Sequence, residues 1–159
     1  MVDVIRGRFR RADGVEVERE VVEHPGSVGV LAYDERFVYL VRQPREAVGH
    51  DRLLEIPAGK IDAGESAIEC GKRELAEETG LAAERWTELH TIYASPGYVD
   101  EEITIFAATR LSEVKAEPDA EEQIEIVRLP VAEIDSALPG IADAKTLVGL
   151  LLLKRELGR

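Results

Sequence analysis

Three glutamates stand close together in the segment RELAEETGL, which covers residues 73–81. In a helix, residues three or four positions apart are neighbours, so Glu74 would lie beside both Glu77 and Glu78. Like charges at this spacing cost roughly 0.2–0.5 kcal/mol per pair. Two explanations are open: a solvated acidic face, or a face that holds a divalent cation. Carboxylate oxygens are ligands that Mg²⁺ prefers, and a bound cation would reverse the repulsion.

The composition of the chain excludes several classes of function. Its 159 residues fit one domain, with 45% hydrophobic and 33% charged residues. A net charge of −12 argues against nucleic acid or an anionic membrane as a partner, and a phosphate-bearing ligand would need cations to approach. The single cysteine, Cys70, excludes a disulfide framework or a multi-cysteine metal site, and we expect it to be half-buried in a helix. The longest apolar run, at 150–153, is too short to cross a bilayer, and a cytoplasmic location fits these features.

Alternating and apolar runs bounded by turn signals predict an α/β protein with a mixed sheet between helices. The turn at Asp13-Gly14 joins two strands into an N-terminal hairpin. Further strands are expected at 27–33, 37–43, 52–57, 86–94, 102–110 and 124–129, and a glycine-rich loop at 57–65. Helical periodicity runs from 66 to 79 and stops at Gly80, and further helices are expected at 131–138 and 143–157.

The loop and the first helix together read GKIDAGESAIECGKRELAEETGL, from Gly59 to Leu81. Every fixed position of the Nudix box is matched, and the chain therefore resembles the Nudix hydrolases. The matching positions are Gly59, Glu65, Arg73, Glu74, Leu75, Glu77, Glu78, Gly80 and Leu81. The resemblance implies a Nudix-type α/β/α sandwich over residues 25–159, and nucleophilic substitution at a diphosphate. Residues 1–24 would form a hairpin extension outside it, suited to act as a dimerisation arm.

The resemblance also implies a metal site on the acidic helix. Glu74 and Glu78 would be the main protein ligands of Mg²⁺, or of another divalent cation such as Mn²⁺. Glu77 would be a further or water-mediated ligand, and the backbone carbonyl of Ala58 would complete the set. Glu78 would in this way take part in catalysis.

Three other positions of the box suit a structural clamp of its loop. By resemblance, Arg73 and Glu65 form an ion pair that fixes the loop against the helix, and Gly59 lets the loop bend. For Gly59 an ordinary turn residue is the alternative.

Segments on either side of the box resemble the ADP-ribose pyrophosphatase branch of the family. These are VRQPREAVGHDRLLEIPAGKID before the box, and Pro96, sixteen residues beyond Gly80. The segment PDAEEQIEIV resembles the loop that carries the catalytic base in this branch. Its alignment favours Glu122, with Glu121 next and Glu125 third.

This branch implies cleavage of ADP-ribose, or of another ADP-sugar, into AMP and a sugar phosphate such as ribose 5-phosphate. Alternatives are another nucleoside diphosphate sugar, a dinucleotide, or an ADP-ribose-binding module without catalysis. A binding module would be expected to lose a glutamate of the box, whereas this chain retains all three.

Substrate contacts are expected outside the box. Arg45 matches a substrate-contacting position of the branch, and a guanidinium suits phosphate, although a surface charge is the alternative. Ser95, Gly97 and Glu101 lie in the loop that would hold the terminal ribose. Glu55 could accept from sugar hydroxyls or anchor the end of its strand. We expect a homodimer, in which the arm could reach the partner's site.

Overall fold

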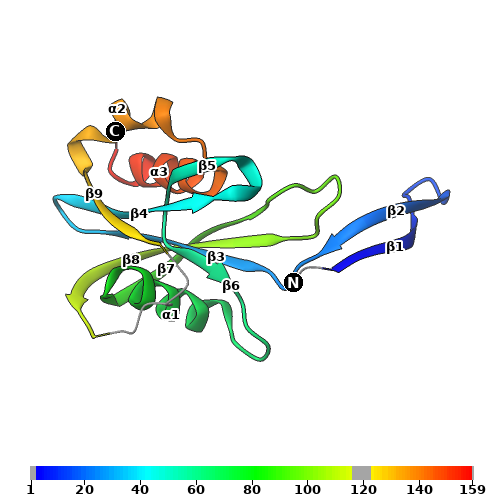
Figure 1. Cartoon of the computed structure of the whole chain (residues 1–159), viewed down its shortest axis with the longest axis horizontal. Helices are drawn as coiled ribbons and strands as arrows, with labels where there is room; N and C mark the ends of the chain where they lie inside the picture. The colour runs from blue at the N-terminus through cyan, green and yellow to red at the C-terminus, as the bar shows by residue number, and fades with distance from the viewer. Residues whose placement is uncertain (1–2, 116–122, 159) are drawn as a thin grey trace.

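The computed structural model describes residues 3–115 and 123–158, and it is a mixed β-sheet held between helices (Figure 1). The sheet has the order β5-β4-β3-β8-β7, while β6 pairs with β3 and β9 pairs with β4. The strands are β3 (Ser27–Tyr33), β4 (Phe37–Arg45), β5 (His50–Glu55), β6 (Ala58–Lys60), β7 (Leu81–Tyr93), β8 (Glu102–Glu113) and β9 (Glu125–Pro130). The α-helices are α1 (Ala67–Thr79), α2 (Ile134–Ala137) and α3 (Ala144–Glu156), with 3₁₀ turns at Glu46–Val48, Val131–Glu133 and Leu138–Gly140. Among the described residues, no helix has the length and apolarity needed to cross a membrane.

The strand β3 lies in the middle of the sheet and is buried on both faces. Val28 and Val30 pack in one apolar cluster with Leu75 of α1. Leu31, which points the opposite way, packs in a second cluster with Leu150 of α3. β3 pairs in parallel with β8, and strands in such pairs are typically covered on both sides by helices. The α/β/α sandwich expected from the sequence is confirmed.

The helix α1 begins and ends at residues that carry standard capping chemistry. The side chain of Ser66 accepts from the backbone N–H of Glu69, and the Glu69 carboxylate accepts from the backbone N–H of Ser66. Gly80 ends the helix in the left-handed region, with φ of 67°. These signals explain why the predicted helix, 66–79, and α1 agree within one residue.

Several element boundaries differ from the sequence-based expectation, and for two of them the cause is tertiary pairing. Part of the expected loop 57–65 is the strand β6, because Ala58–Lys60 pairs with Ser27–Gly29 of β3. β7 begins at Leu81 instead of residue 86, since its whole length pairs with β8 apart from one bulge. In both places tertiary pairing, which local sequence does not contain, decides the structure.

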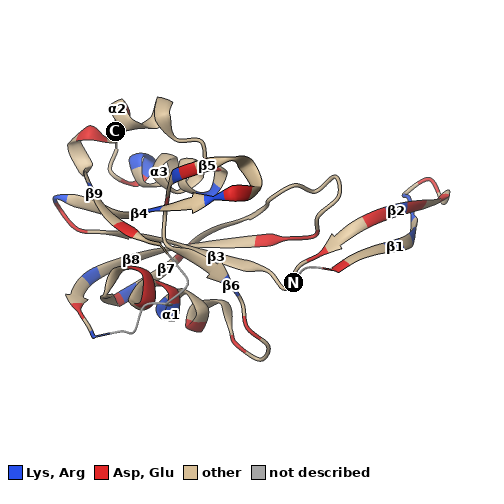
Figure 2. Ribbon diagram, in the orientation of Figure 1, with Lys and Arg blue, Asp and Glu red and all other residues tan. Residues whose placement is uncertain are grey.

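The hairpin β1 (Asp3–Arg10) and β2 (Glu16–Glu23) projects away from the sandwich, as predicted for the N-terminal extension (Figure 1). Cross-strand ion pairs run along it, including Arg6–Glu20 and Arg10–Glu16, both at 2.8 Å. Figure 2 shows the acidic residues that β2 contributes to this hairpin. Its base is tied to the body by a hydrogen bond from the N–H of Val22 to the carbonyl of Tyr98, at 2.8 Å.

The N-terminus of α3 is attached to the end of β5 through Thr146. Its hydroxyl donates to Oδ2 of Asp143, the N-cap of α3, at 2.6 Å. The same hydroxyl accepts from the backbone N–H of Ile56 at 2.7 Å, and Thr146 is fully buried. One hydroxyl therefore satisfies the buried N–H of Ile56 and also bonds to the partly buried carboxylate of Asp143.

We predict that Thr146→Val lowers the free energy of unfolding by roughly 1–3 kcal/mol, because it leaves the buried N–H of Ile56 without its acceptor. Urea denaturation followed by circular dichroism measures this difference. Ser136→Ala, which removes an exposed hydroxyl bonded to the carbonyl of Glu133, serves as the control and should change stability by less than about 0.5 kcal/mol. Equal stability of Thr146→Val and the wild type would contradict this account.

Candidate active site

A cleft of about 550 Å³ lies where the N-terminus of α3, the end of β4, β6 and α1 come together. Its lining contains nearly balanced charges, four basic and five acidic among the described residues, although the chain carries −12. An anionic ligand therefore meets a local environment much less negative than the chain as a whole. The charged lining residues are Arg45, Lys60, Arg73 and Lys145, with Asp62, Glu74, Glu78, Glu101 and Asp143.

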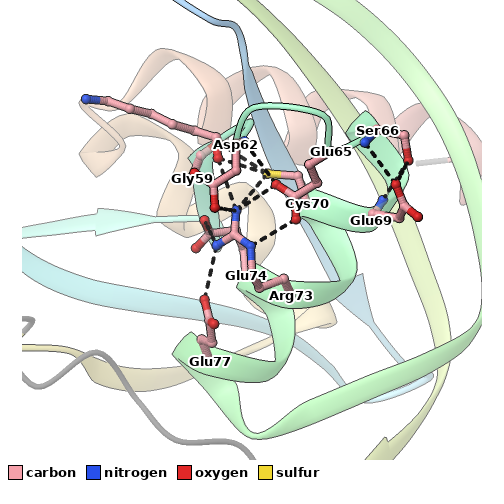
Figure 3. A network of polar contacts seen from close by, with 10 residues as sticks. Gly59, Asp62, Glu65, Ser66, Glu69, Cys70, Arg73, Glu74 and Glu77 are labelled. Atoms are coloured by element: carbon pink, nitrogen blue, oxygen red, sulfur yellow. Dashed lines mark hydrogen bonds and ion pairs between the residues drawn. The ribbon is translucent and has the colours of Figure 1, made fainter. Parts of the chain in front are cut away.

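The guanidinium of Arg73 lies at the centre of the acidic face of α1 (Figure 3). It donates to both carboxylate oxygens of Glu65 at 3.0 Å, to Glu74 at 2.6 Å and to Glu77 at 3.1 Å. A further bond at 3.1 Å reaches the backbone carbonyl of Lys60 in β6. The repulsion expected along this helix is therefore partly compensated from within the helix itself.

These contacts shift the proton affinities of both partners. The hydrogen bonds from Arg73 are the main cause that lowers the pKa of Glu65 to about 2. The bonds to Glu65, followed by those to Glu74, raise the pKa of Arg73 above its ordinary value. Glu65 is thus ionised at neutral pH and in mild acid.

Glu74 and Glu78 are held against the backbone of Ala58 and Gly59. A Cβ atom at residue 59 would lie 1.8 Å from Oε1 of Glu74, so that only glycine leaves room for this carboxylate. The buried Glu78 accepts from the backbone N–H of Ala58 at 3.0 Å. Both carboxylates line the cleft beside Ala58, and this is where the sequence predicted the metal ligands.

The chemistry of these donors fits a hard divalent cation. Within residues 3–115 and 123–158, no three His, Cys, Asp or Glu side chains form a group that could hold a metal ion by themselves. Mg²⁺ does not require one, because it commonly takes one or two carboxylates, keeps several waters and binds substrate phosphates. Glu74, Glu78 and the carbonyl of Ala58 match that demand. Glu77 is outside the cleft lining and pairs with Arg73.

Arg45 and Glu55 form a second polar group beside the cleft. Two hydrogen bonds of 2.7 and 2.9 Å join the Arg45 guanidinium to the Glu55 carboxylate, which is 1% exposed. Lys145 of α3 also donates to Glu55, and to Asp143 at 3.0 Å. Burial raises the pKa of Glu55, but the bonds from Arg45 and the charge of Lys145 outweigh it and lower the pKa overall. Glu55 thus anchors Arg45, which lines the cleft, and does not itself reach the lining.

The other predicted substrate residues do not come together in one hollow. Glu101 lines the cleft, whereas Gly97 lines a separate hollow beside the arm, together with Pro96, Tyr98 and Phe9. Ser95 lines neither hollow, and its carbonyl accepts from the backbone N–H groups of the loop that follows it.

Of the three candidate bases, Glu125 lies within the described residues. Glu121 and Glu122 lie outside the described residues. Glu125 begins β9, pairs with Arg52 and Arg42, and is outside the cleft lining.

Several cleft residues were not predicted from the sequence. Lys145 and Asp143 come from the start of α3, whose capping signal at Asp143 was visible but whose docking beside Glu55 was not. His24 and Ser27 come from the segment between the arm and β3 and had no motif to mark them. Gln43, on β4, lies two residues before the predicted Arg45.

Cys70 lies beneath this site and does not suit nucleophilic chemistry. It is fully buried, rather than half-buried as expected, and its Sγ lies 3.3 Å from the carbonyl of Lys60. Burial is the main cause that raises the pKa of this thiol to about 12. Cys70 therefore fills space between α1 and β6 as a small apolar residue.

A family model of the NUDIX domain matches residues 23–149. The chain therefore belongs to the Nudix family and is a Nudix hydrolase. It is 37% identical over 147 residues to an ADP-ribose pyrophosphatase of Bacillus subtilis (strain 168), covering 89% of this chain and 79% of that protein. It is 32% identical over 152 residues to a GDP-mannose pyrophosphatase of Cronobacter sakazakii (strain ATCC BAA-894), covering 87% and 79%. A crystal structure of an ADP compounds hydrolase matches 99% of this chain and 87% of its own, with a TM-score of 0.84 and 26% identity.

We predict that Glu65→Gln destabilises the protein at neutral pH and that this difference shrinks as the pH falls. The folded-state pKa of Glu65, about 2, is below its ordinary value of 4.5, so the carboxylate stabilises the fold above pH 4.5. That contribution is lost progressively between pH 4.5 and about 2. Urea unfolding of wild type and variant at pH 7 and pH 3 measures the difference.

The exposed Glu133→Gln provides the matched control, since Glu133 has no ion pair among the described residues. A stability difference that stays constant between pH 7 and pH 3 would contradict the role given to the Arg73–Glu65 pair.

Proposed function

We propose that this Nudix hydrolase cleaves the diphosphate of ADP-ribose, giving AMP and ribose 5-phosphate. The observation that carries the proposal is a single cleft lined by Glu74 and Glu78 of the box and the adjoining Ala58, together with Arg45 and Glu101. The chain is 37% identical to an ADP-ribose pyrophosphatase in an alignment that covers 89% of this chain, and this similarity supports ADP-ribose as the substrate.

Glu74, Glu78 and the carbonyl of Ala58 are the groups that would hold Mg²⁺ in this cleft. The bound cation would neutralise diphosphate charge and lower the pKa of a bound water. Glu77 would serve as an outer ligand, reached through water. Arg73, by pairing with Glu65, keeps the loop before α1 packed against the helix that carries these carboxylates.

The protein's own side chains carry out the remaining steps. Arg45, held in place by the buried Glu55, donates to a phosphate of the substrate. Glu101 accepts from hydroxyls of the terminal ribose. A loop carboxylate takes a proton from the attacking water while the bond between phosphorus and the bridging oxygen breaks. The resemblance favours Glu122 for this role, with Glu121 as the second choice.

A nucleotide sugar other than ADP-ribose is the alternative, supported by the 32% identity to a GDP-mannose pyrophosphatase. The two proposals share the metal site and differ only in the groups that contact the base and the sugar. They are separated by comparing substrates under identical conditions.

We predict Mg²⁺-dependent release of AMP from ADP-ribose, with a higher kcat/KM than for GDP-mannose, and loss of activity when EDTA removes the metal. Glu78→Gln should lower kcat/KM by roughly 100-fold or more, because it removes a charged ligand of the cation. Glu88→Gln, on an exposed position of β7, is the matched control and should keep wild-type activity.

Preferential hydrolysis of GDP-mannose would reject ADP-ribose as the preferred substrate. It would leave the proposed reaction, hydrolysis of a diphosphate, unchanged. Binding of ADP-ribose without hydrolysis of either compound would instead identify a binding module.

We further propose that the chain forms a homodimer through the arm, β1 and β2. A lone two-stranded hairpin is marginally stable in water, and this one leaves Val4 68% and Phe9 43% exposed. Ile5, 36% exposed, lies on the same face of β1 as Phe9, whereas Val4 lies on the opposite face. A second copy of the chain would cover Ile5 and Phe9 and could bring the arm to the partner's cleft.

Light scattering after size-exclusion chromatography should give twice the chain mass of 17.6 kDa. The double variant Ile5→Asp/Phe9→Asp should shift the protein towards the single-chain mass, because it places charge in the apolar contact. Val48→Asp, at a 72% exposed residue outside the arm, is the control. A wild-type protein of 17.6 kDa would reject the dimer.

A further inference from the structure

Residues 24–27, here called the junction, connect the arm to β3 and contact two loops of the cleft. The backbone N–H of His24 donates to Oδ1 of Asp100 at 2.8 Å, in the loop after β7. The carbonyl of Gly26 accepts from the N–H of Ile61 at 3.1 Å, in the loop before α1. The junction therefore holds both loops relative to the sheet.

The side chains of the junction gather around one carboxylate. The hydroxyl of Ser27 donates to Oε1 of Glu101. Nδ1 of His24 lies 3.8 Å from the same oxygen and accepts from the backbone N–H of Gly26 at 3.2 Å, so that His24 shapes the junction itself. Ser27 and the side chain of His24 are each only 8% exposed, and all three residues line the cleft. The bond from Ser27 falls on Oε1, so a ligand hydroxyl would be accepted by the other oxygen, Oε2.

The anchor for this carboxylate is part of the sheet. Ser27 is the first residue of β3, and it is aligned with Lys60 of β6 on one side and with Ile103 of β8 on the other. Groups held by a sheet are positioned more accurately than groups held by a loop. A glutamate that is already fixed in its bound rotamer loses less conformational entropy when a ligand arrives.

We propose that Ser27 is a positioning residue that holds Glu101 for the terminal sugar and thereby sets sugar selectivity, and that His24 supports it by fixing the junction through Gly26. The inference rests on the proposed function, because it takes Glu101 to contact the sugar of the substrate. The N–H of Val22, in the arm, donates to the carbonyl of Tyr98, which lies in the same loop as Glu101. The loop that carries Glu101 is therefore attached to the arm as well as to the junction. The hydroxyls of a different terminal sugar would lie in other positions. A carboxylate that is held in one place could not move to accept hydrogen bonds from them.

The test compares ADP-ribose with ADP-glucose, which differ only in the terminal sugar, on the full chain with Mg²⁺. Ser27→Ala should raise KM for ADP-ribose by about five- to tenfold and leave kcat within about twofold, because a positioning bond is lost and no reacting group is changed. The ratio of kcat/KM for ADP-ribose to that for ADP-glucose should fall by a similar factor. Ser27→Thr keeps a hydroxyl and should restore most of this ratio.

Two further variants separate positioning from folding. His24→Gln should lower the same ratio in the same direction, and it tests the proposal independently of how Ser27→Ala folds. Ser136→Ala, at the exposed serine of α2, should keep both the ratio and KM. Thermal unfolding of each variant identifies any general loss of structure.

Unchanged KM and ratio in both Ser27→Ala and His24→Gln would overturn the proposal. An equal fall of activity on both substrates, accompanied by lower thermal stability, would also overturn it, since that pattern is structural. If the wild type hydrolyses neither compound, the proposed function fails first, and the inference falls with it.

Discussion

The contact on which the site depends is the one between the Arg73 guanidinium and its surroundings. A single cation on α1 bonds to carboxylates of the preceding loop and of its own helix, and to a backbone carbonyl of β6. Planar bidentate geometry makes arginine suited to this task, and lysine could not make the same set of bonds. Without this cation, several carboxylates on one helical turn would repel one another and the loop would lose its attachment. The acidic face can therefore exist in the folded protein before any metal arrives.

The sandwich places groups from distant parts of the chain at one edge of the sheet. β3 has apolar clusters on both faces, one towards α1 and the other towards α3. The polar groups of the site therefore lie at the ends of the strands of the sheet. The acidic helix and the α3 N-terminus contribute to the same cleft. Their charges nearly cancel within that cleft, although the chain as a whole is strongly acidic. The fold thus separates solubility, which net charge promotes, from recognition of an anion, which requires local balance.

Sequence reasoning predicted those parts whose determinants are local. The box located α1 within one residue, because its cap at Ser66 and its stop at Gly80 are encoded by neighbouring residues. β6 was missed because its strand character comes from pairing with β3, far away in the chain. Lys145 and the junction residues were missed for the same reason, since tertiary contact alone brings them to the cleft. A motif identifies residues that act together over a short span of sequence. It does not identify single residues that reach the site only through tertiary packing.

The parallel pairing of β3 with β8 has a consequence for how the protein reaches its native state. Ser27 is aligned with Ile103, 76 positions further along the chain, and α1 and β7 lie between them. Closing so long a loop has an entropic cost that only the completed sheet repays, and non-local pairing of this kind slows folding. During synthesis, β3 emerges from the ribosome well before its parallel partner. The apolar face of β3 that packs towards α3 must stay exposed or be covered temporarily until that helix has been made.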